Sequence, residues 1–364
     1  MLDARVWLLW ALTMLVAASS TRNPLYTVLL ALVAAVVGTV CALRDGGERA
    51  VLAPLRFAAI ALPLSALFNA LTVHVGGTAL FRLPGWLPLL GGPVTLEAVV
   101  FGVQNGLVLT VIFAGFAVFN QVTPVRDLVG LAPRAFHEAG VVISIALTFV
   151  PQTMRSLNRI RQAQAVRGYR MRGLRDWPPI VVPLLISGLE RSMGLAEAMV
   201  ARGYGAVSDQ AQPLHTSVGL ALGLLTLLGG WLTFLFWPAR REAGTGLMVG
   251  GGALIVGVVW LAGQSVRHTV YRPRRWTVRD TLAVAGCGLT LVIILTQREA
   301  LYYSPYPRLI LPPFDPFIGL GLLGLLAPAA AIRIGQADRV RSLRSERVDW
   351  ADQSSGQEQG RGDA

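Results

Sequence analysis

Lysine is absent from this sequence of 364 residues, and acidic side chains are few. All 32 basic residues are arginine, against 20 aspartates and glutamates, so the net charge is +12. Without lysine the chain offers no Walker A lysine for nucleotide phosphates, no Schiff-base lysine and no Ser-x-x-Lys nucleophile. The enzyme classes that depend on these lysines are therefore excluded.

Cysteine and histidine are also scarce. Cys41 and Cys287 lie far apart inside apolar stretches, which favours small buried residues over a disulfide framework. The four histidines are scattered, without the His-x-x-x-His or His-Glu-x-x-His spacing of a metal site. Glu97 begins an apolar stretch and is interpreted as an interfacial residue. We therefore predict no catalytic, metal-binding or cofactor-binding residue.

Charged residues make up only 14% of the chain, whereas apolar residues make up 54%. A soluble domain carries about 25% charge. The apolar residues gather in runs close to the roughly 20 residues that cross a bilayer. We predict an all-α polytopic membrane protein with about eight transmembrane helices, the first of them retained rather than cleaved as a signal peptide. The runs are 5–19, 24–43, 53–73, 97–120, 216–237, 246–263, 280–297 and 315–335.

The distribution of arginine predicts the orientation of these spans, because cytoplasmic loops retain positive charge. With the N-terminus inside, 25 arginines fall in cytoplasmic segments and six fall outside. We therefore place both termini in the cytoplasm. The predicted divisions are four spans in 1–120, a cytoplasmic segment 121–215, a span 216–237, an extension 238–340 with about three spans, and a disordered tail 341–364.

The cytoplasmic segment 121–215 is only intermittently apolar and contains eleven arginines. Its pattern predicts two amphipathic helices, from Glu138 to Arg167 and from Pro179 to Arg202, with Pro151 inside the first. Apolar positions of the first helix recur every three or four residues and so share one face. They are Ile143, Leu147, Val150, Met154, Leu157 and Ile160.

Both predicted helices end in the same way. Arg167-Gly168-Tyr169 and Arg202-Gly203-Tyr204 are 35 positions apart. Glycine stops a helix readily and a cation favours its C-terminus, so either end alone is explained as a cap. The repetition favours a second role, in which each arginine projects past the helix end into an acidic notch of another protein.

These ends resemble the two Ala-Arg-Gly-type motifs of the T component of energy-coupling factor (ECF) transporters, a family that includes the cobalt-transport permeases. Ala201-Arg202-Gly203 matches fully, whereas Val166-Arg167-Gly168 has valine in place of alanine. The resemblance covers about residues 1–237. Further matching stretches are Leu2–Arg5, Thr21–Leu25, Phe68–Ala70, Leu83–Gly85, Leu90–Ala98 and Phe149–Pro151.

The resemblance implies a non-catalytic scaffold in the inner membrane of a prokaryotic cell. Two ABC ATPase subunits would grip the coupling helices and use ATP, and a substrate-binding S component would carry a vitamin or a transition metal such as cobalt or nickel. No cofactor would bind directly, and no nucleic acid would be a partner. The ATPase-coupling residues would be Arg167, Gly168, Ala201, Arg202 and Gly203, and those supporting the S component would be Ile143, Leu147, Met154 and Leu157.

Two other classes remain open on the sequence: a membrane-embedded enzyme and a secondary transporter. A secondary transporter normally shows an intramembrane ionisable residue or broken helices at matching places in two halves. Here the polar residues in the middle of the spans are Asn69, Gln104 and Asn105. Residues 246–335 depart from the family. They are interpreted as an extension packed on the rim, with replacement of part of a partner's contact surface as the alternative.

Overall fold

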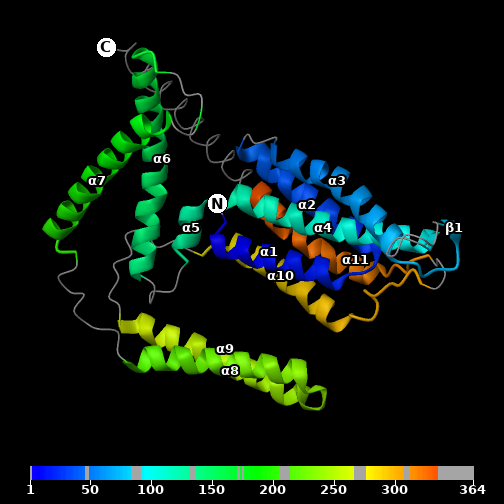
Figure 1. Cartoon of the computed structure of the whole chain (residues 1–364). Helices are drawn as coiled ribbons and strands as arrows, with labels where there is room; N and C mark the ends of the chain where they lie inside the picture. The colour runs from blue at the N-terminus through cyan, green and yellow to red at the C-terminus, as the bar shows by residue number, and fades with distance from the viewer. Residues whose placement is uncertain are drawn as a thin grey trace, which may run out of the picture. The chain divides into compact units, whose positions relative to one another are not determined.

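The computed structural model describes residues 2–45, 49–82, 92–131, 137–169, 173, 176–204, 214–265, 276–306 and 311–334 (Figure 1). The predicted disordered tail 341–364, the matching stretch Leu83–Gly85 and the first two residues of the stretch Leu90–Ala98 lie outside these residues. Contacts divide the chain into two compact units, Met1–Pro124 with Arg272–Ala364, and Val125–Tyr271. This grouping cuts through the predicted extension 238–340, because its first helix belongs to the second unit and its later helices belong to the first.

The first unit is a bundle of long helices at least partly buried against one another (Figure 1). Its core is built from large apolar side chains of α1 and α2, including Trp10, Met14, Tyr26 and Leu30, each no more than 1% exposed. Trp7 and Trp10 pack edge to face, with ring centroids 5.8 Å apart. The helices are α1 (Ala4–Ser20), α2 (Pro24–Asp45), α3 (Arg49–Thr72), α4 (Leu96–Val122), α10 (Val278–Thr296) and α11 (Pro316–Leu322).

The C-terminal helices of the first unit contribute to this core. Ile294 of α10, Ile318 of α11 and Leu325 of the following 3-10 turn η4 (Leu323–Leu326) are fully buried in it. The indole Nε1 of Trp10 donates a hydrogen bond of 2.9 Å to the Leu325 carbonyl, and Asn23 Nδ2 donates one of 2.7 Å to the Pro313 carbonyl. The interpretation of this part of the extension as a rim addition is therefore wrong.

Glycines allow the backbones of the bundle to approach closely. A Cβ on Gly102 of α4 would lie 2.6 Å from the Ser65 carbonyl of α3, and one on Gly286 of α10 would lie 2.4 Å from the Gly324 carbonyl. Real Cβ atoms do not come so near. Small residues at these crossings are the usual means by which membrane helices pack without a hydrophobic driving force.

A short antiparallel hairpin, which the sequence did not predict, lies between α3 and α4. Its strands are β1 (Ala79–Arg82) and β2 (Pro93–Thr95). The fully buried carboxylate of Glu97 accepts hydrogen bonds from the Thr78 amide and hydroxyl at 3.1 and 2.9 Å. Glu97 thus anchors the segment that leads into the hairpin.

The second unit contains α5 (Val125–Val129), α6 (His137–Val166), α7 (Pro178–Ala201), α8 (Leu214–Phe236) and α9 (Arg241–Ser265). The bounds of α6 and α7 lie within one residue of the prediction, and α6 continues through Pro151. Helices α8 and α9 form a hairpin in close contact. A Cβ on Gly230 would lie 2.7 Å from the Met248 amide, and one on Gly251 would lie 2.7 Å from the Leu227 amide.

Nine helices in the described part of the chain are long and apolar enough to cross a membrane, judged by length and composition. They include α6 and α7, which have the lowest mean hydropathy of the nine, at 1.3. Helix α1, with 17 residues, falls just short of the length required. The prediction of an all-α polytopic membrane protein is confirmed.

Candidate docking site at the ends of α6 and α7

The two helix ends that the sequence singled out share one backbone geometry. At the end of α6, the Gly168 amide donates to the Ala165 carbonyl and the Tyr169 amide donates to the Gln164 carbonyl, both at 3.0 Å. At the end of α7, the Gly203 amide donates to Val200 at 2.9 Å and the Tyr204 amide donates to Met199 at 3.0 Å. Each pair is the double hydrogen bond of a Schellman cap. The repeat seen in the sequence is therefore a repeat of structure.

Glycine is required at both ends by its backbone conformation. Gly168 has φ of 79° and Gly203 has φ of 78°, in the left-handed region that side chains with a Cβ rarely adopt. A Cβ at either position would meet no heavy atom within 4 Å. The space around these glycines is therefore open, and a substitution there would strain the backbone without causing a collision.

The arginines that precede these glycines are exposed. Among the described residues, no hydrogen bond or ion pair involves the guanidinium of Arg167 or Arg202. Their neighbours are exposed as well, with Val166 at 90% and Val200 at 71%. Exposed apolar side chains beside an unpaired guanidinium are typical of a surface that contacts another molecule, because arginine can form a forked pair with a carboxylate.

The two ends differ in the tyrosine that follows. The Tyr169 hydroxyl donates a hydrogen bond of 2.9 Å to the Asp176 carbonyl, which ties the end of α6 to the segment before α7. Desolvation and the nearby Asp176 carboxylate raise the pKa of Tyr169. Tyr204 is 45% exposed, and the described residues hold no side-chain partner for it. The end of α6 is thus braced, whereas the end of α7 is more open.

The residues predicted to support an S component lie on α6, but they differ in exposure. Ile143 and Met154 are 44% and 58% exposed, whereas Leu147 and Leu157 are half-buried. Exposed apolar residues also occur on α7, including Leu189 and Met193 at 63% and 62%. An apolar surface that a partner could cover is therefore not confined to the predicted α6 face.

A polar cleft on α6 and α7 was not predicted as a unit. It has a volume of about 570 Å³. Arg155, Arg159 and Gln162 lie close together along α6, and the pairing of the helices adds Arg191 from α7. The cleft is lined by Gln152, Arg155, Asn158, Arg159, Gln162 and Arg191.

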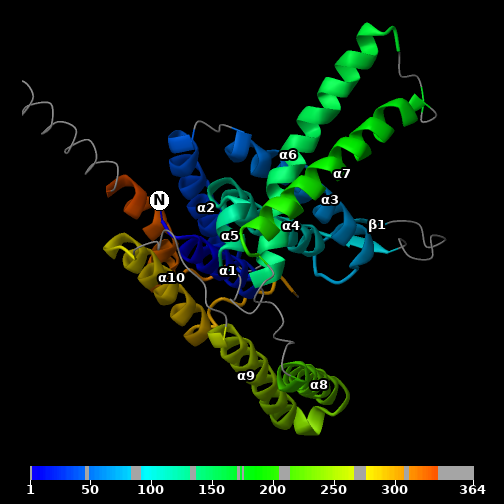
Figure 2. The ribbon, with the colours of Figure 1, turned by 90° about the vertical axis from the view of Figure 1, so that its left-hand side faces the viewer.

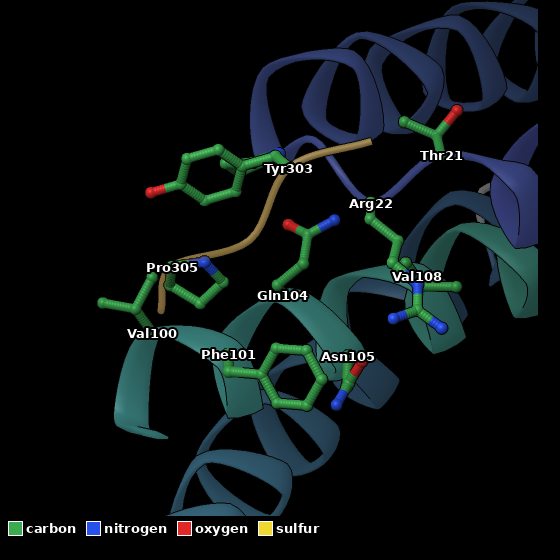
Figure 3. Close-up of a pocket in the computed structure, with 10 residues that line it drawn as sticks. Thr21, Arg22, Val100, Phe101, Gln104, Asn105, Val108, Tyr303 and Pro305 are labelled. Carbon is green, nitrogen blue, oxygen red and sulfur yellow. The ribbon is translucent and has the colours of Figure 1, made fainter. Parts of the chain in front are cut away.

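A second, much smaller cavity of about 30 Å³ lies in the first unit (Figure 3). Gln104 reaches into it from α4 toward the segment that carries Tyr303 and Pro305, and its Nε2 donates a hydrogen bond of 2.8 Å to the Thr27 hydroxyl. Its Oε1 is buried and has no partner among the described residues. The volume is that of a single water molecule. This cavity suits a structural water and is too small for a transported solute.

Buried acids in the described part of the first unit serve as anchors. Asp280 accepts hydrogen bonds from the amides of Asp3 and Thr277 at 3.0 and 2.9 Å, and Glu97 holds the segment before the hairpin. Both stand at the first turn of a helix, where a carboxylate is favoured by the helix dipole.

The fold and the two helix ends define the class of the protein. It is a multi-pass helical membrane protein with a pair of matched Arg-Gly helix ends. Residues 1–213 match the family model CbiQ, described as cobalt transport protein. Because the match covers more than half of the sequence, the chain belongs to the cobalt transport protein family. The match ends at residue 213, before α8, whereas the resemblance in the sequence extended to about residue 237.

Curated relatives agree with this family. The chain is 29% identical over 180 residues to the energy-coupling factor transporter transmembrane protein EcfT 1 of Listeria monocytogenes, covering 43% of this chain and 67% of the relative. It is 32% identical over 157 residues to EcfT of Thermanaerovibrio acidaminovorans, covering 38% of this chain and 57% of the relative. For EcfT of Streptococcus equi, at 33% identity over 114 residues, the match covers 29% of this chain and 42% of the relative.

Proposed function

We propose that this protein is the transmembrane scaffold of an ECF-type ABC importer, which transmits ATP-driven motion of two ATPase subunits to a substrate-binding S component. The observation that carries the proposal is the pair of Schellman caps, each with an exposed arginine immediately before the left-handed glycine. Both caps lie within the family match, and the relatives are named energy-coupling factor transporter proteins.

Each helix end suits a contact with an acidic site on one ATPase subunit. Arg167 and Arg202 offer planar guanidinium forks with five donors each, and the charge cannot be lost at physiological pH. The Schellman cap turns the chain away directly after the arginine, which leaves the fork accessible. Two such ends on two helices fit two ATPase subunits, with Gly168, Ala201 and Gly203 shaping the contact. ATP is then used by the partners, and this chain binds no cofactor.

Long helices are suited to carrying motion from these ends to the membrane. A helix of 30 residues such as α6 is about 45 Å long. The exposed apolar residues Ile143 and Met154, with the half-buried Leu147 and Leu157, support the S component in this proposal. The cargo would be a vitamin or a transition metal such as cobalt or nickel. The protein would lie in a prokaryotic inner membrane with both termini in the cytoplasm.

The test is co-purification of the full chain with its ATPase subunits after single and double substitution at the helix ends. Loss of one partner of a buried charged contact costs about 2–5 kcal/mol, so Arg202→Ala should weaken docking roughly 30-fold or more. Arg167→Ala should do the same, and the double variant should be worse than either. Arg→Lys should rescue only partly, because an ammonium group lacks the fork.

Arg161→Ala is the matched control, since Arg161 is an exposed arginine of α6 that precedes the cap. Docking should change little in this variant. If Arg167→Ala, Arg202→Ala and Arg161→Ala all retained the ATPase subunits equally at matched expression, the Arg-Gly ends would be ordinary helix caps and the coupling assignment would fail.

A further inference from the structure

The charged residues described around the polar cleft of the second unit are all positive. Three of its six described lining residues are arginines, and the other three are the neutral amides Gln152, Asn158 and Gln162. No aspartate or glutamate is among these described lining residues. Three guanidinium groups around one open space repel one another, and they favour an anion between them.

Two of these arginines are held in place by one buried hydroxyl. Ser156 of α6 is 6% exposed, and its Oγ accepts hydrogen bonds from Arg159 at 3.2 Å and from Arg191 of α7 at 3.1 Å. Arg191 also lies over the Phe149 ring, 5.9 Å from its centroid. A neutral hydroxyl orients the two guanidinium groups without neutralising them. Arg155, the third, has no hydrogen-bond or ionic partner among the described residues.

The packing of the helices fixes the two sides of the cleft relative to each other. Besides the Ser156–Arg191 contact, Gln164 Nε2 donates a hydrogen bond of 3.3 Å to the Pro179 carbonyl. Moving from Gln164 back to Ser156 on α6 therefore corresponds to moving forward from Pro179 to Arg191 on α7. The helices are thus antiparallel neighbours at these contacts, and Figure 2 shows them close together, whereas Figure 1 shows that they spread apart toward the end of α7. The cleft is a property of this packed pair.

The arginines of the cleft are set apart from the helix ends, on helices that also expose apolar surface. Arg159 precedes Arg167 by eight residues, which is about 12 Å along the helix axis. Both helices that form the cleft also expose large apolar side chains: Val150 and Met154 on α6, and Leu189 and Met193 on α7. An Arg-lined cleft on helices that also expose apolar side chains suits the membrane interface, where lipid headgroups meet acyl chains.

We propose that this cleft binds the phosphate group of an anionic phospholipid, with Arg155, Arg159 and Arg191 as the charged ligands and the neighbouring amides as further donors. Phosphate oxygens suit guanidinium forks, and basic pockets between membrane helices bind anionic headgroups. The bound lipid would neutralise the cleft and fix the angle between α6 and α7. This inference goes beyond ATPase coupling and does not depend on it.

The experiment measures lipid retention by the full chain in detergent, using native mass spectrometry with short-chain phosphatidylglycerol, short-chain phosphatidylcholine or inorganic phosphate as the probe. Wild-type protein should retain phosphatidylglycerol in preference to phosphatidylcholine. The variant carrying Arg155→Gln and Arg191→Gln should bind phosphatidylglycerol at least roughly 10-fold more weakly than the wild type. Each lost charged hydrogen bond weakens binding substantially. Arg155→Gln alone should show part of the loss without a change in Tm, because Arg155 has no described partner to lose.

Arg161→Gln is the matched control, because it removes one exposed charge from α6 outside the cleft. It should leave retention of phosphatidylglycerol within about twofold, since a surface charge gives only weak, unspecific attraction. Equal retention by wild type, the double variant and the control would overturn the proposal. So would saturable binding of inorganic phosphate without preference for phosphatidylglycerol, which would assign the cleft to a soluble anion.

A protein ligand for the cleft would give a different result. The double variant would then retain phosphatidylglycerol normally but lose the ATPase subunits, and the lipid assignment would be overturned. Failure of the ATPase-docking proposal can be distinguished from failure of the lipid proposal. ATPase docking is tested with Arg167→Ala and Arg202→Ala, and neither arginine is among the residues that line the cleft.

Discussion

The bundle of the first unit and the α6–α7 pair of the second use apolar residues in opposite ways. In α2, 56% of the most apolar membrane-length window is buried inside the protein, whereas in α6 and α7 the share is 6%. The bundle buries Trp7, Trp10 and Leu30 among its own helices, although leucines of its α3 such as Leu55 and Leu64 are exposed. The pair leaves large apolar residues such as Met154 and Leu189 exposed beside arginines.

This difference separates a part that is stabilised by itself from a part that needs other molecules. Exposed apolar surface on a membrane protein must face lipid or a partner. The α6–α7 pair combines such surface with capped ends and an Arg-lined cleft, so it presents features for contact with several kinds of molecule. The bundle presents buried anchors instead. We therefore expect substitutions in the bundle to affect stability and those in the pair to affect binding.

Accessibility of α6 and α7 from the two sides of the membrane gives the sharpest test, because the result is all or none. In a background without Cys41 and Cys287, we expect Val75→Cys to react with an impermeant thiol reagent in intact cells. We expect Gly173→Cys and Tyr204→Cys to be protected, since the arginine distribution predicts that the α6–α7 pair lies on the cytoplasmic side. Labelling of all three should appear once the cells are permeabilised.

The outcome at Gly173 distinguishes two threadings. If α6 and α7 crossed the membrane, as their length and composition allow, Gly173→Cys would be labelled from outside while Tyr204→Cys stayed protected. That pattern would place Arg167 outside the cell as well. It would contradict both the cytoplasmic position of the α6–α7 pair and the docking role of Arg167.

A substitution in the bundle should cost far more stability than one of similar kind in the pair. Trp10→Ala removes a fully buried indole and its hydrogen bond to Leu325, and we expect a loss of about 3–5 kcal/mol in unfolding free energy. Met154→Ala trims a side chain that is 58% exposed, and we expect a change within about 0.5 kcal/mol. Unfolding in mixed micelles of detergent and denaturant measures both. Equal losses would mean that α6 is packed as tightly as α1.

Close helix contact within the bundle can be tested with two glycines of α10. Gly286→Ala would place a Cβ 2.4 Å from the Gly324 carbonyl, so we expect about 1–3 kcal/mol of destabilisation. Gly288→Ala is the control, because a Cβ there meets nothing within 4 Å. It should be neutral or stabilise the helix by up to about 1 kcal/mol, since alanine favours helices. Thermal unfolding measures both variants, and equal melting temperatures would contradict this packing.

Much of the fold could be predicted from the sequence because its signals are local. The bounds of α6 and α7 and their paired caps follow from helical periodicity and from glycine as a stop, and the left-handed φ angles of Gly168 and Gly203 agree. The roles of Arg167 and Arg202 remain predictions, because docking depends on partners. The hairpin of β1 and β2 was missed, since its strands are three or four residues long and their pairing depends on the fold around Glu97.

The sequence by itself determined the membrane class, the helices and the caps, because hydropathy, periodicity and stop residues act within about one turn or one span. Only the tertiary structure decided which distant segments meet. It placed Leu325 on the indole of Trp10, 315 positions away, and made the C-terminal helices part of the core. It also brought Arg191 to Ser156, 35 positions away, and so assembled the Arg-lined cleft. Such contacts depend on the shapes of two surfaces in three dimensions, which no local pattern encodes.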